Sequence, residues 1–160
     1  MPMKQWSGRA TRFFLTVPLL VIACADPLRS ADDIQPLLLP AAGTSVSTTR
    51  SDPAEIIRAE LDGDVLKLHV RFGGGCAEHD FSLIHTGEFM ESHPVQTRLN
   101  LTHDAHGDNC RALLSRDLTF DLAPVKRAYQ QSYSEHGALI LHVHPPESQS
   151  ARAHSLRYEF

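Results

Sequence analysis

The sequence predicts one all-β domain over residues 51–160, mainly an antiparallel sandwich or a small barrel, with one short helix. Apolar and polar residues alternate with a period of two from residue 55 onward. Turn residues divide this region into seven or eight short segments. The glycine-rich phosphate loop and the strand–helix rhythm of nucleotide-binding folds are both missing. A length of 160 residues with 21% charged residues fits one globular domain preceded by a tail.

The first residues have the pattern of an export signal. Lys4, Arg9 and Arg12 are the charged residues of a basic start, and an apolar stretch follows over Phe13–Ala23. A basic start, a short apolar stretch and small residues at its end are typical of a secretory signal peptide. The apolar stretch is too short to span a bilayer that is about 30 Å thick. We therefore expect a signal peptide over residues 1–23.

The end of this segment, Val21-Ile22-Ala23-Cys24, resembles the lipobox of bacterial lipoproteins. The resemblance implies cleavage before Cys24 and attachment of acyl chains such as palmitate to that residue. It also implies a lipid anchor in the membrane of the bacterial cell envelope, with the domain facing the periplasm or the cell exterior. Two or more acyl chains anchor a protein stably. An ordinary secretory signal, with Cys24 incidental, is the alternative.

Residues 24–50 are expected to be the lipidated cysteine and a flexible tether. They are rich in Pro, Ser, Thr and Asp, and such a chain has a reach of roughly 28 Å. Alternatively, Thr44–Thr49 adds an edge strand. Removal of residues 1–23 takes away three basic residues and leaves 12 basic against 19 acidic residues, a net charge of -7. A nucleic-acid partner is not expected for so acidic a chain.

The strands of the first half are separated by clear turn signals. Asp62-Gly63 is a strong hairpin signal, whereas Thr86-Gly87 and His93-Pro94 punctuate later segments. The third strand is expected over His79–His85, and a polar loop over His103–Asn109. The residues expected to share one face of each strand are, in order, Ile57, Ala59 and Leu61; Leu66, Leu68, Val70 and Phe72; Phe81 and Leu83; and Val95, Thr97, Leu99 and Leu101.

The second half adds the helix and the last strands. Ala123-Pro124 opens a helical stretch, because Pro is tolerated in the first turn, and Gly137 ends it. Val125, Ala128 and Tyr129 fall on one face of that helix. The strands are expected as short pairing over Cys110–Leu114, a strand containing Leu118, Phe120 and Leu122, and strands over Ala138–His144 and Ala153–Phe160.

Two cysteines remain once Cys24 carries lipid. Cys76 and Cys110 are expected to form a disulfide, because exported proteins reach an oxidising compartment. The bridge would close a loop of about 35 residues and stabilise the fold by roughly 3.8 kcal/mol. The alternative is that both thiolates bind metal, although neither lies in a C-x-x-C pair.

Three of the ten histidines gather around this bridge in the sequence. His79 follows Cys76, and His103 and His106 precede Cys110. A disulfide holds its two Cα atoms about 5.5 Å apart, so it would draw His79 toward the other two. With nearby carboxylates they are the candidate ligands of a zinc or copper ion, and no other cofactor is expected. Alternatively, the histidines only bond to backbone groups around a pinned loop. His142 and His144, which share a strand face, are a weaker metal candidate.

The pattern over Gly75–Phe81, His106–Cys110 and Phe120–Pro124 resembles that of small uncharacterised bacterial lipoproteins. The resemblance covers about 50 residues and implies a shared bridge and loop, with no activity attached. No G-x-S-x-G or H-E-x-x-H motif is present. The expected function is a membrane-anchored, extracytoplasmic, non-enzymatic module that binds a protein or small ligand or supports the envelope. The alternatives are a metal-binding lipoprotein and a hydrolase with an unrecognised site.

Overall fold

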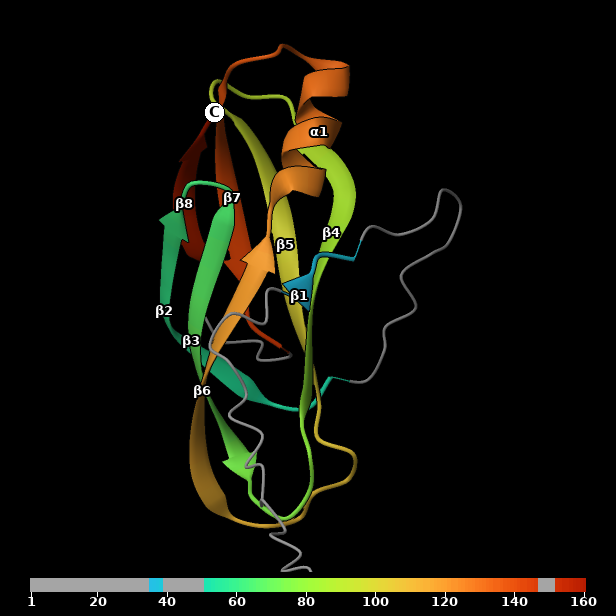
Figure 1. Ribbon diagram of the computed structural model, residues 1–160, viewed down its shortest axis with the longest axis vertical. Helices are drawn as coiled ribbons and strands as arrows, with labels where there is room; N and C mark the ends of the chain where they lie inside the picture. Colours follow the sequence, from blue (N-terminus) through green and yellow to red (C-terminus); the bar gives the residue numbers. More distant parts are fainter. Residues whose placement is uncertain (1–34, 39–50, 147–151) are drawn as a thin grey trace, which may run out of the picture.

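Two four-stranded sheets pack face to face in the computed structural model, which describes residues 35–38, 51–146 and 152–160 (Figure 1). The first sheet has the strand order β1-β6-β3-β2 and the second has the order β4-β5-β7-β8. The signal peptide, Cys24 and the possible strand over Thr44–Thr49 lie outside the described residues. The elements are β1 (Gln35–Pro36), β2 (Ala54–Asp62), β3 (Val65–Gly74), β4 (Asp80–Met90), β5 (Val95–Asp104), β6 (Ala112–Asp121), α1 (Ala123–Ser132), β7 (Ala138–His144) and β8 (His154–Glu159).

The predicted all-β class is confirmed, and the two separate sheets make it a sandwich. Most strand pairs are antiparallel, whereas β1 with β6 and β5 with β7 are parallel. In Figure 1, α1 lies at one end of the sandwich, where the chain leaves β6 in one sheet and enters β7 in the other. No helix in the described part of the chain is both long and apolar enough to cross a membrane.

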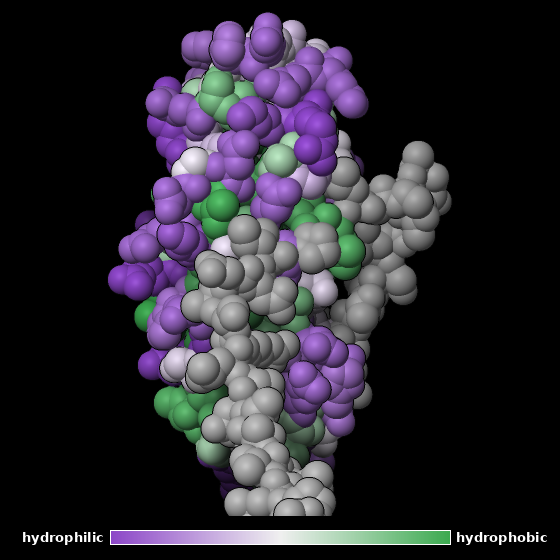
Figure 2. All heavy atoms as spheres, viewed as in Figure 1, coloured by the Kyte–Doolittle hydropathy of each residue, from purple (hydrophilic) through white to green (hydrophobic). Residues whose placement is uncertain are grey.

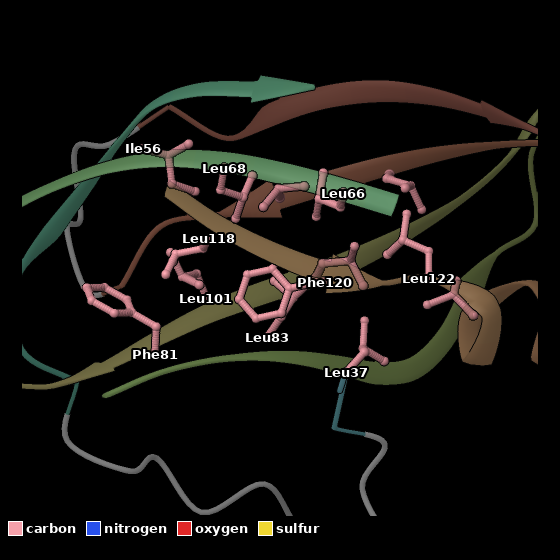
Figure 3. Packing of buried hydrophobic residues seen from close by; sticks show 14 of the residues in the cluster. Leu37, Ile56, Leu66, Leu68, Phe81, Leu83, Leu101, Leu118, Phe120 and Leu122 are labelled. Carbon is pink, nitrogen blue, oxygen red and sulfur yellow. The ribbon is translucent and has the colours of Figure 1, made fainter. Parts of the chain in front are cut away.

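The core lies between the sheets and follows the period of two. The four alternating residues of β3 are buried, and they meet buried leucines of β4, β5 and β7 (Figure 3). Burial of one such side chain stabilises a fold by about 1.5–3 kcal/mol. The hairpin at Asp62-Gly63 is confirmed, since β2 and β3 pair around it and Gly63 has a φ of 58°.

β2 departs from the expected pattern at its start. The sequence placed Ile57 on the core face, but Ile56 is buried and Ile57 is 42% exposed. The cause is a β-bulge between Ile56 and Arg58, which shifts the side-chain alternation by one residue. His154 Nε2 of β8 lies 3.0 Å from the carbonyl oxygen of Ile56 and donates to it. The bulged segment thus joins the neighbouring edges of the two sheets.

Three strands are longer than the sequence indicated, and one of them, β5, continues to Asp104, into the loop that was expected to begin at His103. Thr86-Gly87 does not end β4, because the strand continues to Met90 through an irregular register after His85. The two short strands expected around Cys110–Leu114 and Leu118–Leu122 are one strand, β6, which pairs with β3 from Ala112 to Asp121. The polar residues in its middle do not interrupt backbone pairing.

Residues 35–38, which fall within the expected tether, are part of the sandwich. Gln35 and Pro36 pair with β6, and Leu38 exchanges backbone hydrogen bonds with Leu83 and His85 of β4. Leu37 is 6% exposed and points between the sheets toward the core (Figure 3). This short segment therefore closes one open side of the sandwich.

α1 and the C-terminal strand are tied together by Asp64 in the β2–β3 turn. Its carboxylate accepts a hydrogen bond from the Tyr158 hydroxyl at 2.7 Å and faces the Lys126 ammonium at 3.2 Å. The Tyr158 hydrogen bond lowers the pKa of Asp64. The helix ends at Ser132, earlier than the expected stop at Gly137, and its predicted face is confirmed by the burial of Val125 and Tyr129.

Candidate functional site

The Cys76–Cys110 disulfide is present and joins two loops at one end of the sandwich. Cys76 lies between β3 and β4, Cys110 lies between β5 and β6, and their Cα atoms are 5.8 Å apart. We call residues 75–79 and 103–110, which meet here, the clasp. As expected from the spacing, the bridge accompanies a close approach of His79 to His103.

Asp108 is the centre of the clasp. The sequence pattern places it only among the carboxylates near the three histidines and indicates no role of its own. Its Oδ2 atom accepts hydrogen bonds from the backbone N–H groups of Gly75, Cys76 and Ala77 at 2.8–3.0 Å. Its Oδ1 atom accepts the N–H of Cys110 at 2.8 Å. The side chain is fully buried. The N–H groups of Cys110 and Cys76 hold the pKa of Asp108 far below its usual value, so the carboxylate is ionised.

His79 and His103 continue the network from Asp108 into the protein. His79 Nε2 lies 3.2 Å from Asp108 Oδ2, and His79 Nδ1 lies 2.8 Å from His103 Nε2. His103 Nδ1 lies 3.3 Å from the carbonyl oxygen of Asp52. Both residues are 2% exposed. Every ring nitrogen of the pair thus faces a protein group, and neither ring faces solvent.

Aromatic rings and one arginine enclose the pair. The His103 ring stacks on Phe81 with a centroid distance of 4.4 Å, and the His79 ring lies 4.8 Å from Phe72. Arg116 donates to the carbonyl oxygen of His79 at 2.7 Å, and its guanidinium lies 5.7 Å from the centroids of both phenylalanines. Sequence reasoning missed Arg116, although it continues the inward alternation of β6.

His106 is not part of this buried pair. Its side chain is 48% exposed, and its Nε2 atom donates to Asp80 Oδ2 at 2.8 Å. The hydrogen bond to Asp80, followed by the charge of Asp104, raises the pKa of His106. The structure therefore brings two of the three predicted metal ligands together and places the third on the surface.

The geometry of the clasp does not assemble a three-histidine metal set. Among the described residues, the Cys76, Asp108 and Cys110 donor atoms do lie within 4.8 Å of one another. The two sulfur atoms are bonded to each other, however, and metal binding requires thiolates. The ring nitrogens of His79 and His103 are already used in hydrogen bonds. The alternative interpretation, in which the histidines bond to backbone groups around a pinned loop, fits the contact of His103 with the Asp52 carbonyl, whereas His79 contacts the side chains of Asp108 and His103.

The other histidines have separate surroundings. His85 is buried, with Nε2 2.8 Å from the Thr97 hydroxyl, and burial lowers its pKa. His142 contacts Gln96 and Ser155 on the outer face of the second sheet, and burial lowers the pKa of its neighbour His144. The inward position of His79, His85 and His103 could have been found from the sequence, because each continues the period-two face of its strand.

The outer face of the first sheet is strongly polar. Across it, Lys67 pairs with Asp62 at 2.8 Å and His69 pairs with Asp117 at 2.7 Å. A surface hollow lies on this face, and its lining includes Lys67, His69, Asp117, Arg58 and Glu60. In Figure 2, hydrophilic residues likewise cover much of the described surface around α1.

The fold has counterparts among solved structures. A candidate toxin-related protein from Parabacteroides distasonis aligns with 78% of this chain and 60% of its own, with 18% identity and a TM-score of 0.52. A NigD-like immunity protein from Bacteroides caccae aligns over 79% and 64%, with 16% identity and a TM-score of 0.54. A candidate lipoprotein from Bacteroides fragilis aligns over 79% and 68%, with 12% identity and a TM-score of 0.51.

These likenesses establish the class of fold. The chain shares its fold with these bacterial proteins, and it spans less than two thirds of the length of the first two neighbours. No protein-family model matches the sequence. No curated protein is similar to it at a significant level.

Proposed function

We propose that this chain is a lipid-anchored, extracytoplasmic and non-enzymatic binding module of a bacterial cell envelope. The observation that carries the proposal is the lipobox-like Val21–Cys24 segment in a chain whose two later cysteines form a disulfide. An oxidised cysteine pair suits the compartment to which such a signal leads. The fold shared with a candidate lipoprotein supports the same location.

The chemistry of the clasp supports binding or support rather than catalysis. A general base must reach the proton that it removes from a substrate. His79 and His103 face Asp108, each other and a backbone carbonyl, and they are buried. The His–Asp network therefore acts as a structural tie between loops.

Labelling of cells with palmitate tests the anchor. The wild-type chain should incorporate the label and sediment with membranes, whereas Cys24→Ser should lose the label and the stable membrane association. The matched control is the double variant Cys76→Ser/Cys110→Ser, which keeps Cys24 and should still be labelled. A labelled Cys24→Ser variant, or an unlabelled wild type, would contradict lipidation at this residue.

The polar outer face of the first sheet is the surface that we assign to the partner. It offers alternating charges and a hollow on a rigid three-strand platform, β2-β3-β6. The names of two neighbours, an immunity protein and a toxin-related protein, favour a protein as partner. Rigid strands present polar groups in fixed positions, which favours specific recognition.

Cross-linking in intact cells tests this assignment. A photo-reactive amino acid placed at Thr119, on the outer face of the first sheet, should give a discrete covalent adduct with one protein. The same amino acid at Ser155, on the outer face of the second sheet, is the matched control and should not. An adduct at Ser155 alone would move the binding surface to the second sheet.

A further inference from the structure

His79 and His103 form a series of three polar contacts that begins and ends at a hydrogen-bond acceptor. One end of the network is the Asp108 carboxylate, 3.2 Å from His79 Nε2. The other end is the carbonyl oxygen of Asp52, 3.3 Å from His103 Nδ1. In the middle, the two rings share one contact of 2.8 Å. Carboxylate and carbonyl oxygens only accept hydrogen bonds, so both ends require an N–H from an imidazole.

Counting protons gives the charge of the pair. Each neutral imidazole carries one N–H, so two neutral rings supply two protons for three contacts. With only two protons, one contact in the series sets a nitrogen lone pair against another acceptor. A third proton satisfies all three contacts, and the contact with the Asp108 carboxylate favours His79 as the ring that donates from both nitrogens. We propose that the His79–His103 pair binds one proton more than two neutral rings carry, and that this proton latches the β3–β4 loop onto the β5–β6 loop.

The surrounding charges favour one extra proton. The Asp108 carboxylate is buried beside His79, and within the described part of the chain its other hydrogen-bond partners are backbone N–H groups, so a positive charge on the pair balances it. The Arg116 guanidinium lies on the other side, where it donates to the His79 carbonyl oxygen. The Asp52 carboxylate accepts the N–H of Ala105. The ring systems of Phe72 and Phe81 fill the remaining sides and add no charge.

A second extra proton is disfavoured. Burial, and then the charge of His79, lower the pKa of His103. The pair therefore holds one positive charge in common, and its titration belongs to both rings together.

Release of the extra proton should weaken the contact between His79 and Asp108 in the clasp. The contact that joins the two loops is the one between His79 Nε2 in the β3–β4 loop and Asp108 Oδ2 in the β5–β6 loop, at 3.2 Å. Asp108 also accepts the N–H groups of Gly75, Cys76 and Ala77. Loss of the positive partner leaves this buried carboxylate without a counter-charge. The stability that this contact contributes is therefore lost once the pair has released its extra proton.

Nitrogen-15 NMR of the imidazole rings in the full chain tests the proton count directly. At about pH 6 the two rings should together carry three N–H groups, with both nitrogens of His79 protonated. As pH rises, the pair should lose one proton in a single coupled step. His106→Gln removes the exposed histidine of the clasp, assigns its signals and should leave this step unchanged. Two neutral rings at about pH 6 would overturn the proposal.

Amide hydrogen exchange tests the latch. Protection factors at Gly75, Cys76, Ala77 and Cys110 should fall about tenfold once the pair has released its proton, while those of Leu141 in β7 stay constant. Asp108→Asn removes the counter-charge and should move the release to lower pH. Should that variant fail to fold, the wild-type exchange profile still decides the question, because constant protection across the release would contradict the latch.

Discussion

Gly74 and Asp108 both lie against the Nε2 atom of the His79 ring, so there is no room for a side chain at position 74. Gly74 has a φ of 149°, and a Cβ atom at this position would lie 2.3 Å from His79 Nε2 and 3.0 Å from Asp108 Oδ2. The hydrogen bonds of the clasp hold the side chains of His79 and Asp108 in these positions. The glycine is thus required by the close approach as well as by the backbone conformation.

Gly74→Ala should lower the free energy of unfolding by about 2 kcal/mol, because the added methyl displaces a buried network. Gly73→Ala is the matched control one residue earlier, where a Cβ meets no atom within 4 Å among the described residues. It should change stability by less than about 0.5 kcal/mol. Urea unfolding of both variants gives the comparison, and equal losses would argue against the close approach at Gly74.

His85 contributes an acid-sensitive site that is separate from the clasp. Thr97 donates its hydroxyl proton to the Glu88 carbonyl, so His85 Nε2 donates to Thr97 and Nδ1 is left as an acceptor. That buried Nδ1 has no hydrogen-bond partner among the residues that the structure describes. A buried acceptor without a partner costs about 1–3 kcal/mol of folding free energy. The cost of burying this ring is greatest at acid pH, because the unfolded chain is then stabilised by protonation of His85.

His85→Leu should make the protein less sensitive to acid. Burial lowers the pKa of His85 in the fold, so the unfolded state binds more protons between that value and about 6.5. Stability from the neutral ring is therefore lost as pH falls through this range. Chemical unfolding at several pH values should show a shallower decline below neutral pH for the variant than for the wild type. Identical slopes would mean that His85 does not control this range.

At the scale of elements, residues 35–38 form a short edge segment of the sandwich, where the sequence pattern predicted a flexible tether. Only two of its residues pair with β6, and one further residue bridges to β4. Its stabilising part is Leu37, which joins a core cluster made by both sheets. Four residues with one apolar anchor are too few to show a period of two.

Leu37→Ala should lower the free energy of unfolding by about 2–3 kcal/mol, as large-to-small changes in cores do. Leu38→Ala is the matched control, because this neighbouring side chain is 49% exposed. Its effect should stay within about 0.5 kcal/mol. If the two variants lose the same stability, the segment does not insert Leu37 between the sheets.

Reduction of Cys76–Cys110 should lower stability by about 2–4 kcal/mol, because the bridge closes a loop with a sequence separation of 34. The expected state stays folded, since Asp108 still joins the two loops. Thermal unfolding with and without a dithiol reductant measures the difference. The double variant Cys76→Ala/Cys110→Ala should show no effect of the reductant, and a reductant effect there would have another origin.

At the scale of the whole molecule, three ties hold the two sheets as one body. The edge segment 35–38 closes one side, His154 with Ile56 joins the other, and Asp64 links α1, β8 and the β2–β3 turn. The clasp adds a fourth connection at the end opposite α1 in Figure 1. Because these connections cover the sides of the sandwich, its two outer sheet faces and its loops are the main surfaces open to a partner.

Processing before Cys24 predicts a spectroscopic change in the whole protein. The single tryptophan, Trp6, lies in the expected signal peptide, while the three tyrosines lie in the folded domain. Protein purified from membranes should therefore show tyrosine emission without tryptophan emission. Unprocessed chain made without export is the control and should emit as tryptophan. Tryptophan emission from the membrane form would contradict cleavage at this position.

Much of the fold could be predicted because it depends on local patterns. The local alternation of apolar residues predicts β3 and its buried face without reference to any other part of the chain, through Leu66, Leu68, Val70 and Phe72. The errors arose where pairing partners decide the outcome. The bulge at Ile57 and the passage of β4 through Thr86-Gly87 depend on the register of the neighbouring strand, which local alternation does not contain.

The candidate site was predicted in part for the same reason. The cysteine spacing indicated that His79 and His103 would meet, and they do. His106 was grouped with them by sequence proximity, but it follows the end of β5 and has turned to the surface. Asp108 and Arg116 gain their roles from groups that are 29 to 37 residues away, so no local pattern marks them.

The sequence by itself determined the all-β class, the faces of most strands, the helix and the cysteine pair, since these follow from short-range periodicity and residue chemistry. Only the tertiary structure decided the two-sheet order, the inclusion of residues 35–38 and the direction in which each histidine points. Those features are set by long-range backbone pairing and by the burial of charged groups, where the energy of one residue depends on partners far along the chain.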